Sequence, residues 1–219
     1  MIRTLSLLES RVLGVMVEKQ HTVPDTYPLS LNSLTAGCNQ KSSRDPVMAA
    51  SDAQVQATVD GLKLLDLVYE GSGGRVTRYA HNFGKVVGVP SQSVALLTVL
   101  MLRGPQTLAE LRIHSERIHK FVDISAVEGF MNELREKQFV VELPRAPGAR
   151  EPRWAHLLCG PVEMPLYAQQ AASAERNVAD MSLSELVALK TRLEALEADN
   201  AQLKATVAKL CAEFGITPA

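Results

Sequence analysis

The sequence predicts an α+β fold, mainly α, in which two tandem winged-helix units, each a helix-turn-helix with a β-hairpin, precede a C-terminal coiled-coil helix. Three observations support this prediction: the chain repeats part of its own sequence, each copy carries the signals of three helices and a hairpin, and the C-terminal segment has a heptad pattern. The repeat is clearest at residues 75–81, RVTRYAH, which return as REPRWAH at residues 150–156. Such self-similarity is typical of a duplicated structural unit.

Each copy is expected to begin with two helices. The first is apolar and covers about residues 5–19 in the first copy and 93–103 in the second. A second helix should follow, because both copies contain Pro-x-Ser/Thr-Leu-x-x-Leu, at residues 28–34 and 105–111. The hydroxyl groups of Ser30 and Thr107 can cap free amides at the helix start, and leucines three residues apart face one side.

A third helix and a hairpin complete each copy. Apolar residues at the spacing of one helical face predict the third helix: Val55, Val59, Leu62 and Leu65 in the first copy, and Val127, Phe130, Met131 and Leu134 in the second. Strand-like segments follow in pairs, at 67–70 and 75–81 in the first copy and at 139–143 and 151–157 in the second. The glycine-rich turn of the first pair supplies the positive φ that a hairpin turn needs.

These elements predict winged-helix domains at residues 1–84 and 85–160, a linker at 161–181 and a coiled-coil helix at 182–215. Because each unit alone is small for an independent core, we expect the two units to pack on each other or to share the segment around residues 84–90. An α+β duplication without any role in DNA binding is the alternative interpretation.

The C-terminal segment has apolar residues at alternating steps of three and four, with one asparagine in the seam: Leu186, Leu189, Leu193, Leu196, Asn200, Leu203, Val207, Leu210 and Phe214. An asparagine at an a position favours a parallel, in-register dimer, in which it meets a second amide. The flanking pairs of such a dimer are opposite in charge: Glu185 with Lys190, Arg192 with Glu197, and Asp199 with Lys204. We therefore predict a homodimer, and the alternative is an amphipathic helix that folds back on its own domains.

Composition limits the remaining possibilities. The chain has 219 residues, 46% of them hydrophobic and 21% charged, and a net charge of −1. No segment is long and apolar enough to span a membrane, and the N-terminus has no secretory signal, so we expect a soluble cytoplasmic protein without a membrane partner. Three widely separated cysteines, Cys38, Cys159 and Cys211, indicate reduced structural thiols.

Catalytic and metal-binding patterns are weak. His114 and His119 lie five residues apart, which is a poor spacing for two ligands on one helical face. His81 and His156 occupy equivalent positions in the two copies and are explained as residues of the fold. No histidine has the neighbours of a nucleophile–base pair. We therefore predict that the protein is not an enzyme and needs no cofactor or metal.

A polar loop at residues 39–46 has no counterpart in the second copy. Its cations and hydroxyl groups, those of Lys41, Ser42, Ser43 and Arg44, suit the oxygen atoms of phosphate, and the start of the third helix would add its amides. The alternative is a polar loop whose serine and aspartate residues cap the helix that follows. The sequence leaves both interpretations open.

This loop also carries a resemblance to a known family. The segment CNQKSSRDPV at residues 38–47, followed by Arg-x-x-Arg-Tyr-Ala-His at 75–81 and by the duplicated unit, resembles the YceH family of bacterial proteins. The resemblance covers residues 5–165, approximately, and implies a tandem winged-helix fold. It assigns no catalytic residue to any position. The heptads lie beyond this segment, so the dimer prediction depends on them alone.

The first function hypothesis is a DNA-binding regulator that acts as a dimer on double-stranded DNA. Its candidate contacts lie in the loop, the third helix and the hairpin of the first copy: Lys41, Ser42, Ser43, Arg44, Gln54, Gln56, Thr58, Lys63, Arg75 and Arg78. Residues 1–84 have no net charge, residues 85–160 have +2 and residues 161–219 have −3. A duplex binder usually has a basic stripe, whereas this chain has only local basic patches, which dimerisation would double.

The second hypothesis is a protein-interaction module or scaffold that does not bind DNA. The third helix of the second copy is acidic, with Asp123, Glu128, Glu133 and Glu136. A polyanion would be repelled by this helix, whereas a protein partner could dock on it or on the coiled coil.

Overall fold

A computed structural model describes residues 3–71, 76–145, 149–162 and 200 of the chain. The chain divides into two units, Met1–Glu163 and Met164–Ala219, and the first unit contains all the elements below. The predicted hairpin tips, the linker and the predicted coiled-coil residues other than Asn200 lie outside the described residues. Asn200 itself is helical and exposed. None of the described helices is long and apolar enough to cross a bilayer.

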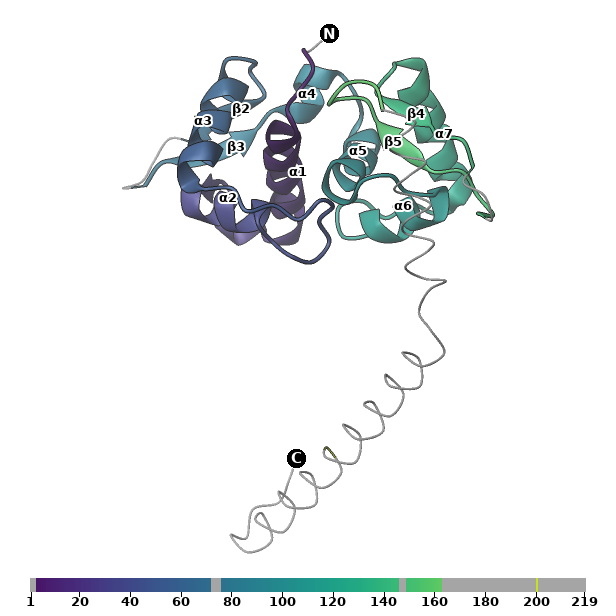
Figure 1. Ribbon diagram of the computed structural model, residues 1–219, viewed down its shortest axis with the longest axis horizontal. Coiled ribbons are helices and arrows are strands. Elements are labelled where there is room, and N and C mark those ends of the chain that lie inside the picture. The colour runs from purple at the N-terminus through teal and green to yellow at the C-terminus, as the bar shows by residue number, and fades with distance from the viewer. Residues whose placement is uncertain (1–2, 72–75, 146–148, 163–199, 201–219) are drawn as a thin grey trace, which may run out of the picture. The chain divides into compact units, whose positions relative to one another are not determined.

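The first half of this unit contains three helices and a small antiparallel sheet (Figure 1). Its elements in chain order are α1 (Leu7–Thr22), the short 3₁₀ helix η1 (Pro24–Thr26), β1 (Leu29–Ser30), α2 (Leu31–Cys38), α3 (Asp52–Lys63), β2 (Val68–Gly71) and β3 (Arg78–His81). The strand order is β1-β3-β2, with Leu29 opposite Tyr79 and Val68 opposite His81. The strand before α2 therefore joins the hairpin that ends this half.

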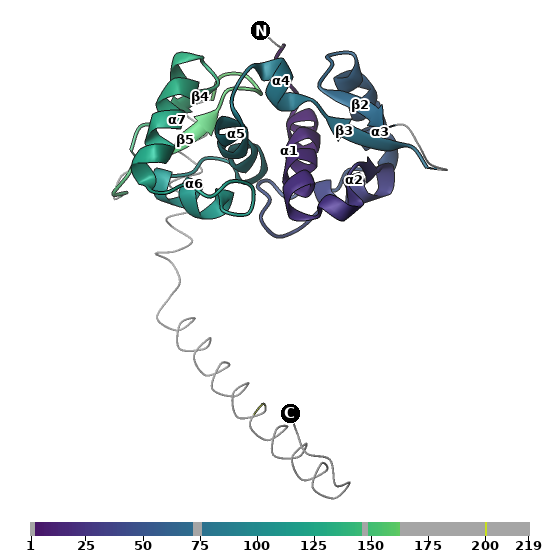
Figure 2. The same cartoon turned by 180° about the vertical axis from the view of Figure 1, so that it is seen from behind.

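The second half repeats this order, as Figure 2 shows from behind. After the connecting helix α4 (Phe83–Val87) come α5 (Ser91–Arg103), α6 (Leu108–Ser115), α7 (Ile124–Glu136), β4 (Val140–Glu142) and β5 (Trp154–His156). A single bridge between Gln106 and Trp154 takes the place of the β1–β3 pairing. The prediction of a mainly helical α+β fold is confirmed, and each half has three helices followed by two paired strands.

Local capping explains where the helices begin. The predicted caps are present, because Ser30 Oγ accepts a hydrogen bond from Ser33 N at 3.3 Å and Thr107 Oγ1 accepts one from Glu110 N at 3.2 Å. Ser51, however, caps α3: its side chain accepts a hydrogen bond from Gln54 N, and Gln54 Oε1 accepts one from Ser51 N at 2.9 Å. The alternative interpretation of the 39–46 loop, in which its serine and aspartate residues cap the helix that follows, is therefore wrong.

Two short elements were not predicted. The strand β1 has only two residues, which is too few for a hydrophobic pattern, and it exists because it pairs with β3. Helix α4 lies largely in the segment around residues 84–90 that connects the two predicted units, and its buried Phe83 anchors it to the core. Helix α3 also ends at Lys63, so Leu65 of the predicted apolar face lies beyond the helix, and Asp66 has a φ of +56°.

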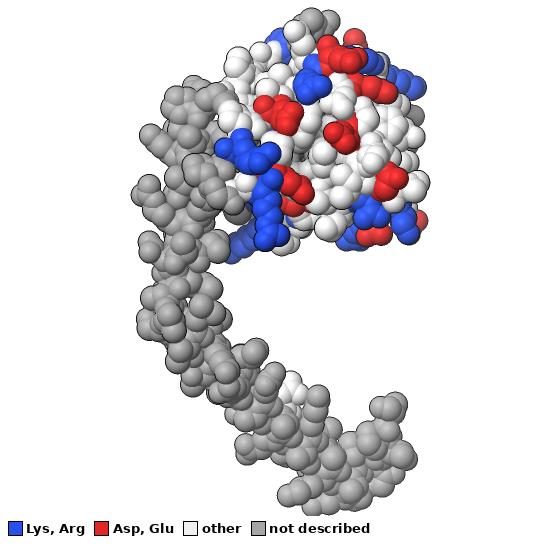
Figure 3. All heavy atoms as spheres, turned by 90° about the vertical axis from the view of Figure 1, so that its right-hand side faces the viewer, with Lys and Arg blue, Asp and Glu red and all other residues white. Residues whose placement is uncertain are grey.

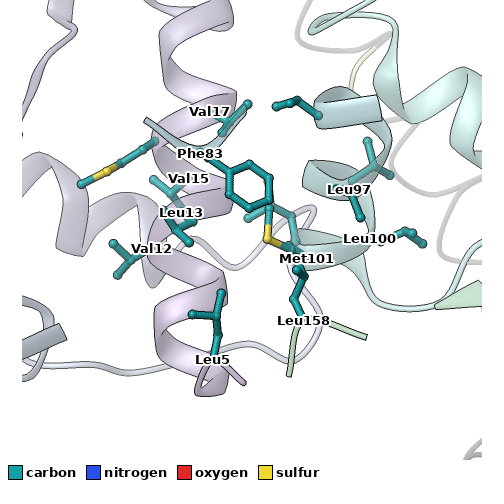
Figure 4. Close-up of a cluster of buried hydrophobic side chains, with 14 of the residues drawn as sticks. Leu5, Val12, Leu13, Val15, Val17, Phe83, Leu97, Leu100, Met101 and Leu158 are labelled. Carbon is teal, nitrogen blue, oxygen red and sulfur yellow. The ribbon is translucent and has the colours of Figure 1, made fainter. Parts of the chain in front are cut away.

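The two halves share one hydrophobic core along α1 and α5, which lie side by side in both ribbon views (Figures 1 and 2). Figure 4 shows side chains of both helices meeting there, with Leu13 of α1 and Leu97 of α5 fully buried. A Cβ atom on Gly14 would lie 2.9 Å from Leu102 Cδ2, so a glycine is what permits this close approach. The expectation that the halves pack on each other is confirmed.

Candidate nucleic-acid interface

Arg44, a predicted phosphate contact, is part of the interior. Its side chain has 0% exposure, and its Nη1 and Nη2 donate to the two carboxylate oxygens of Glu18 at 3.1 and 2.6 Å. Its Nε donates to the carbonyl of Gly37 at 3.2 Å. A guanidinium that is buried and paired in this way cannot meet a phosphate on the surface. The assignment of Arg44 to the interface is therefore corrected: the residue holds the loop against α1.

Two further buried contacts fix the same loop. Arg11 donates from Nη1 to the carbonyl of Cys38 at 3.2 Å and from Nη2 to that of Pro46 at 2.7 Å. Burial and the neighbouring charge of Arg44 lower the pKa of Arg11. The side chain of Asn39 exchanges two hydrogen bonds with the backbone of Ala50, both 2.8 Å long. The loop that has no counterpart in the second copy is thus held by side chains at both of its ends.

The loop also contacts the second half. Arg103 Nη2 donates to Ser43 Oγ at 2.8 Å, and the amide of Asp45 donates to the carbonyl of Leu102 at 2.8 Å. Of the predicted loop contacts, Lys41 and Ser42 remain exposed, although Ser42 Oγ lies 3.2 Å from Gln40 Nε2. Only part of the predicted phosphate cluster is therefore open to a ligand.

The predicted reading residues of α3 have partners within the protein. Gln54 belongs to the α3 capping box, and Thr58 Oγ1 donates to the carbonyl of Gln54 at 2.7 Å. Gln56 accepts from the Tyr79 hydroxyl at 2.9 Å. Lys63 pairs with Glu70, and this contact raises the pKa of Lys63. To contact DNA bases, these side chains would have to exchange their present bonds within the protein for bonds to the bases.

Hairpin arginines of the two halves differ in their neighbours. Arg78 is exposed, and its Nη1 donates to the carbonyl of Pro28 at 2.8 Å; the equivalent Arg153 donates to the carbonyl of Pro105 at 2.9 Å. Arg153 also pairs with Glu110, at 2.8 and 3.1 Å. The first copy has a serine at the position of Glu110, so Arg78 has no carboxylate partner among the described residues. Arg75 lies outside the described residues.

The surface of α7 is acidic. Glu128, Glu133 and Glu136 are exposed, and Asp123 caps the start of the helix by accepting from Ala126 N at 2.8 Å. Figure 3, which faces this side of the molecule, shows carboxylates spread over the surface and cations mainly along its edges. This face is unsuited to a polyanion.

The part of the chain that the structure describes contains no group of three metal-ligating side chains. Cys38 is buried, and this burial raises the pKa of its thiol to about 12. A thiol that stays protonated at neutral pH is neither a good nucleophile nor a good metal ligand.

Comparison with known proteins gives the family. A family model described as "Protein of unknown function, DUF480" matches residues 5–149. The chain belongs to the DUF480 family. It is similar to the UPF0502 protein of Leptothrix cholodnii, with 56% identity over 220 residues that cover 99% of this chain and 98% of the relative. It is also similar to a UPF0502 protein of Burkholderia multivorans, with 57% identity over 217 residues that cover 98% of this chain and 91% of the relative. These matches to DUF480 relatives extend well beyond residue 149, into the predicted coiled-coil segment.

Proposed function

We propose that this DUF480 protein is a tandem winged-helix protein that binds duplex DNA as a homodimer, with its first half on the DNA. The observation that carries this proposal is that the chain just before the second helix pairs with the hairpin in both halves: Leu29 of strand β1 lies opposite Tyr79, and Gln106 forms a single bridge with Trp154. Three helices and a hairpin connected in this way are typical of a winged helix, and winged helices commonly bind nucleic acid. The proposed units are residues 1–84 and 85–160.

The DNA contacts proposed for the first half are contacts to phosphate. Lys41 and Arg78 are exposed and have no carboxylate partner among the described residues, and Ser42 lies beside Lys41. Because Gln54, Gln56 and Thr58 are bonded within the protein, charge supplies more of the affinity than base recognition does. Two such weak sites in one dimer would bind with the avidity of a stronger one, and the heptads from Leu186 to Leu210 are proposed to form that dimer.

Replacing Arg78 by alanine should weaken binding to all duplex sequences alike. A phosphate contact contributes through counterion release, so the slope of log K against log salt, which is negative, should become shallower by about one. The measurement is fluorescence anisotropy of the full-length protein with mixed genomic duplexes, at about 50 and about 200 mM salt.

Arg153→Ala is the matched control, because Arg153 makes the same carbonyl contact but is neutralised by Glu110. It should leave DNA affinity and the salt slope close to those of the native protein. Equal affinities and slopes for Arg78→Ala and the native protein would contradict the proposed role of Arg78. Absence of DNA binding by the native protein even at the lower salt would contradict the DNA-binding function itself.

A second candidate function, a protein-interaction module, is favoured by the surface at the start of α7. Val122, two residues before α7, is exposed by 86%, and Ile124, the first residue of α7, by 45%. Ile113 of α6 is exposed by 64%, and its neighbour Arg112 donates to the carbonyl of Val122. Apolar residues bordered by charge are typical of protein contacts.

For this candidate, the full-length protein should retain a copurifying protein after nuclease treatment. Glu128→Gln combined with Glu133→Gln should abolish that retention, whereas Glu116→Gln, which removes an exposed carboxylate before α7, should preserve it. Loss of the copurifying protein on nuclease treatment alone would assign the association to nucleic acid instead.

A further inference from the structure

A cavity of about 130 Å³ lies between the two halves and is not used by the proposed DNA contacts. Glu18 and Lys19 at the C-terminal end of α1, Ser43 of the loop and Arg103 at the end of α5 line it, together with His114 and Arg117 from α6 and the turn that follows. Both halves and the loop therefore supply its walls. No sequence pattern marks the cavity, because its cations are far apart in the chain.

The charges around this cavity do not cancel. Lys19, Arg103 and Arg117 line it, and Glu18 is the only carboxylate in its lining. The carboxylate of Glu18 pairs with the buried guanidinium of Arg44. Its Oε2 also lies 3.5 Å from Lys19 Nζ. Glu18 is thus shared among several cations, and its single charge cannot neutralise Lys19, Arg103 and Arg117 in addition to the buried Arg44.

The two arginines of the lining retain donors for a ligand. Arg103 donates one hydrogen bond to Ser43 Oγ, and within the described residues it pairs with no carboxylate. Arg117 is exposed and makes no side-chain hydrogen bond or ion pair within the same residues. A planar guanidinium presents paired N–H groups that match the oxygens of a phosphate.

The charges around the cavity act on one another. Burial lowers the pKa of Arg103; the charge of Glu18 raises it, and the charge of Arg44 lowers it. Burial and then the charge of Arg103 lower the pKa of His114, which hydrogen bonds through Nδ1 to Gln106 Oε1 at 2.6 Å. An anion placed here would relieve both repulsions.

We propose that this cavity binds the phosphate group of inorganic phosphate or of a small phosphorylated metabolite. Its volume corresponds to about four water molecules at roughly 30 Å³ each, which suits a tetrahedral oxyanion. Pockets for whole drug-sized ligands are larger, roughly 300–1,000 Å³, so the rest of a metabolite would lie outside. The bound group would contact Lys19 and Ser43 of the first half and Arg103 and Arg117 of the second. It would therefore join the two halves, and this binding does not depend on the proposed DNA contacts.

Isothermal titration calorimetry of the full-length protein tests the proposal, with inorganic phosphate and glycerol phosphate as separate probes at constant ionic strength. Saturable binding of at least one probe is expected, and the tighter one identifies the source of the phosphate group. Arg117→Gln and Arg103→Gln should each weaken binding by about tenfold or more, as expected for the loss of a charged hydrogen-bond donor.

Lys120→Gln is the matched control, because Lys120 is an exposed cation three residues from Arg117 that does not line the cavity. It should bind phosphate like the native protein. Arg117 lies on the surface, so its variant remains informative even where Arg103→Gln fails to fold. The proposal would be overturned if Lys120→Gln weakened phosphate binding as much as the arginine variants do, or if both arginine variants kept the native affinity. It would also be overturned if the protein bound duplex DNA but neither phosphate probe.

Discussion

Replacing Glu18 by glutamine should lower the free energy of unfolding by about 3 kcal/mol, because it leaves the buried Arg44 guanidinium without a counter-charge. Glutamine has nearly the same shape, so the effect isolates the charge. The Arg44 side chain has no exposure to solvent, whereas Glu18 has 18%. Urea unfolding at neutral pH, followed by circular dichroism, measures the loss.

Removal of the cation instead, by Arg44→Met, should lower the free energy of unfolding by less than Glu18→Gln does. The remaining Glu18 is partly hydrated and lies 3.5 Å from Lys19, so it keeps some compensation. The double variant Glu18→Gln, Arg44→Met should be close in stability to Arg44→Met alone, since neither leaves an unpaired buried cation. Additive effects of the two changes would show that the pair is not coupled.

An exposed ion pair provides the control for these variants. Lys63 and Glu70 form a pair on the surface, with side-chain exposures of 35% and 49%. Lys63→Met should change stability by less than about 1 kcal/mol, as is usual for a pair in contact with water. A loss as large as that of Glu18→Gln would mean that burial does not explain the difference.

Acidification should destabilise the protein through two equivalent histidines. Burial lowers the pKa of His81 and of His156 to about 4, and in His81 the nearby His21 adds to the effect. His81 Nδ1 accepts from the amide of Phe83 at 3.3 Å, while its Nε2 lies 2.7 Å from Gln20 Oε1. A proton on Nδ1 would face that amide hydrogen. His156 Nδ1 is buried and has no hydrogen-bond partner within the described residues.

The direction of this pH effect follows from the difference between the histidine pKa in the unfolded and in the folded protein. In the unfolded chain a histidine has a pKa of about 6.5, so between about pH 6.5 and about pH 4 the unfolded state binds protons that the folded state does not. The stabilisation is complete above this window and is lost as the pH falls through it, by about 3 kcal/mol for each histidine. Against a typical total stability of about 5–15 kcal/mol, this is a large loss. Urea unfolding at several values between about pH 7 and about pH 4.5 measures it.

Variants separate these histidines from the carboxylates that also titrate in acid. His81→Asn preserves an acceptor for the Phe83 amide, and His156→Leu removes the buried ring nitrogen; each should flatten the dependence of stability on pH. His119→Asn, which removes a ring packed edge-on against Phe121, shows whether loss of any histidine has this effect. An unchanged dependence in both the His81 and the His156 variants would contradict the assignment.

Helix starts and the duplication were the most predictable features. Ser30 and Thr107 cap helices because the amide that each binds lies three residues away, a relation visible in the sequence. The repeat also placed His81 and His156 at equivalent positions, and both have the same lowered pKa. Strand β1 and helix α4 could not be predicted, because each depends on contacts with distant residues.

The candidate site was less predictable than the fold. Lys41 and Arg44 belong to the same polar loop and look alike in sequence, but Lys41 is exposed and Arg44 is buried. Arg78 and Arg153 occupy equivalent positions, yet only Arg153 has a carboxylate partner among the described residues. In this second pair the difference was visible in the sequence, because Glu110 and the corresponding Ser33 follow equivalent caps. The partner became clear only when the structure brought Glu110 to Arg153.

The sequence by itself determined the order of helices and hairpins, the helix starts and the equivalence of the two copies. These properties depend on periodicity and on hydrogen bonds between residues a few positions apart, which a linear pattern records. The tertiary structure alone decided which cations are available to a ligand and where a cavity forms between the halves. Availability depends on whether a carboxylate from elsewhere in the chain neutralises the cation, as Glu18 does for Arg44 across 26 residues. Packing brings such partners together at distances that no local pattern encodes.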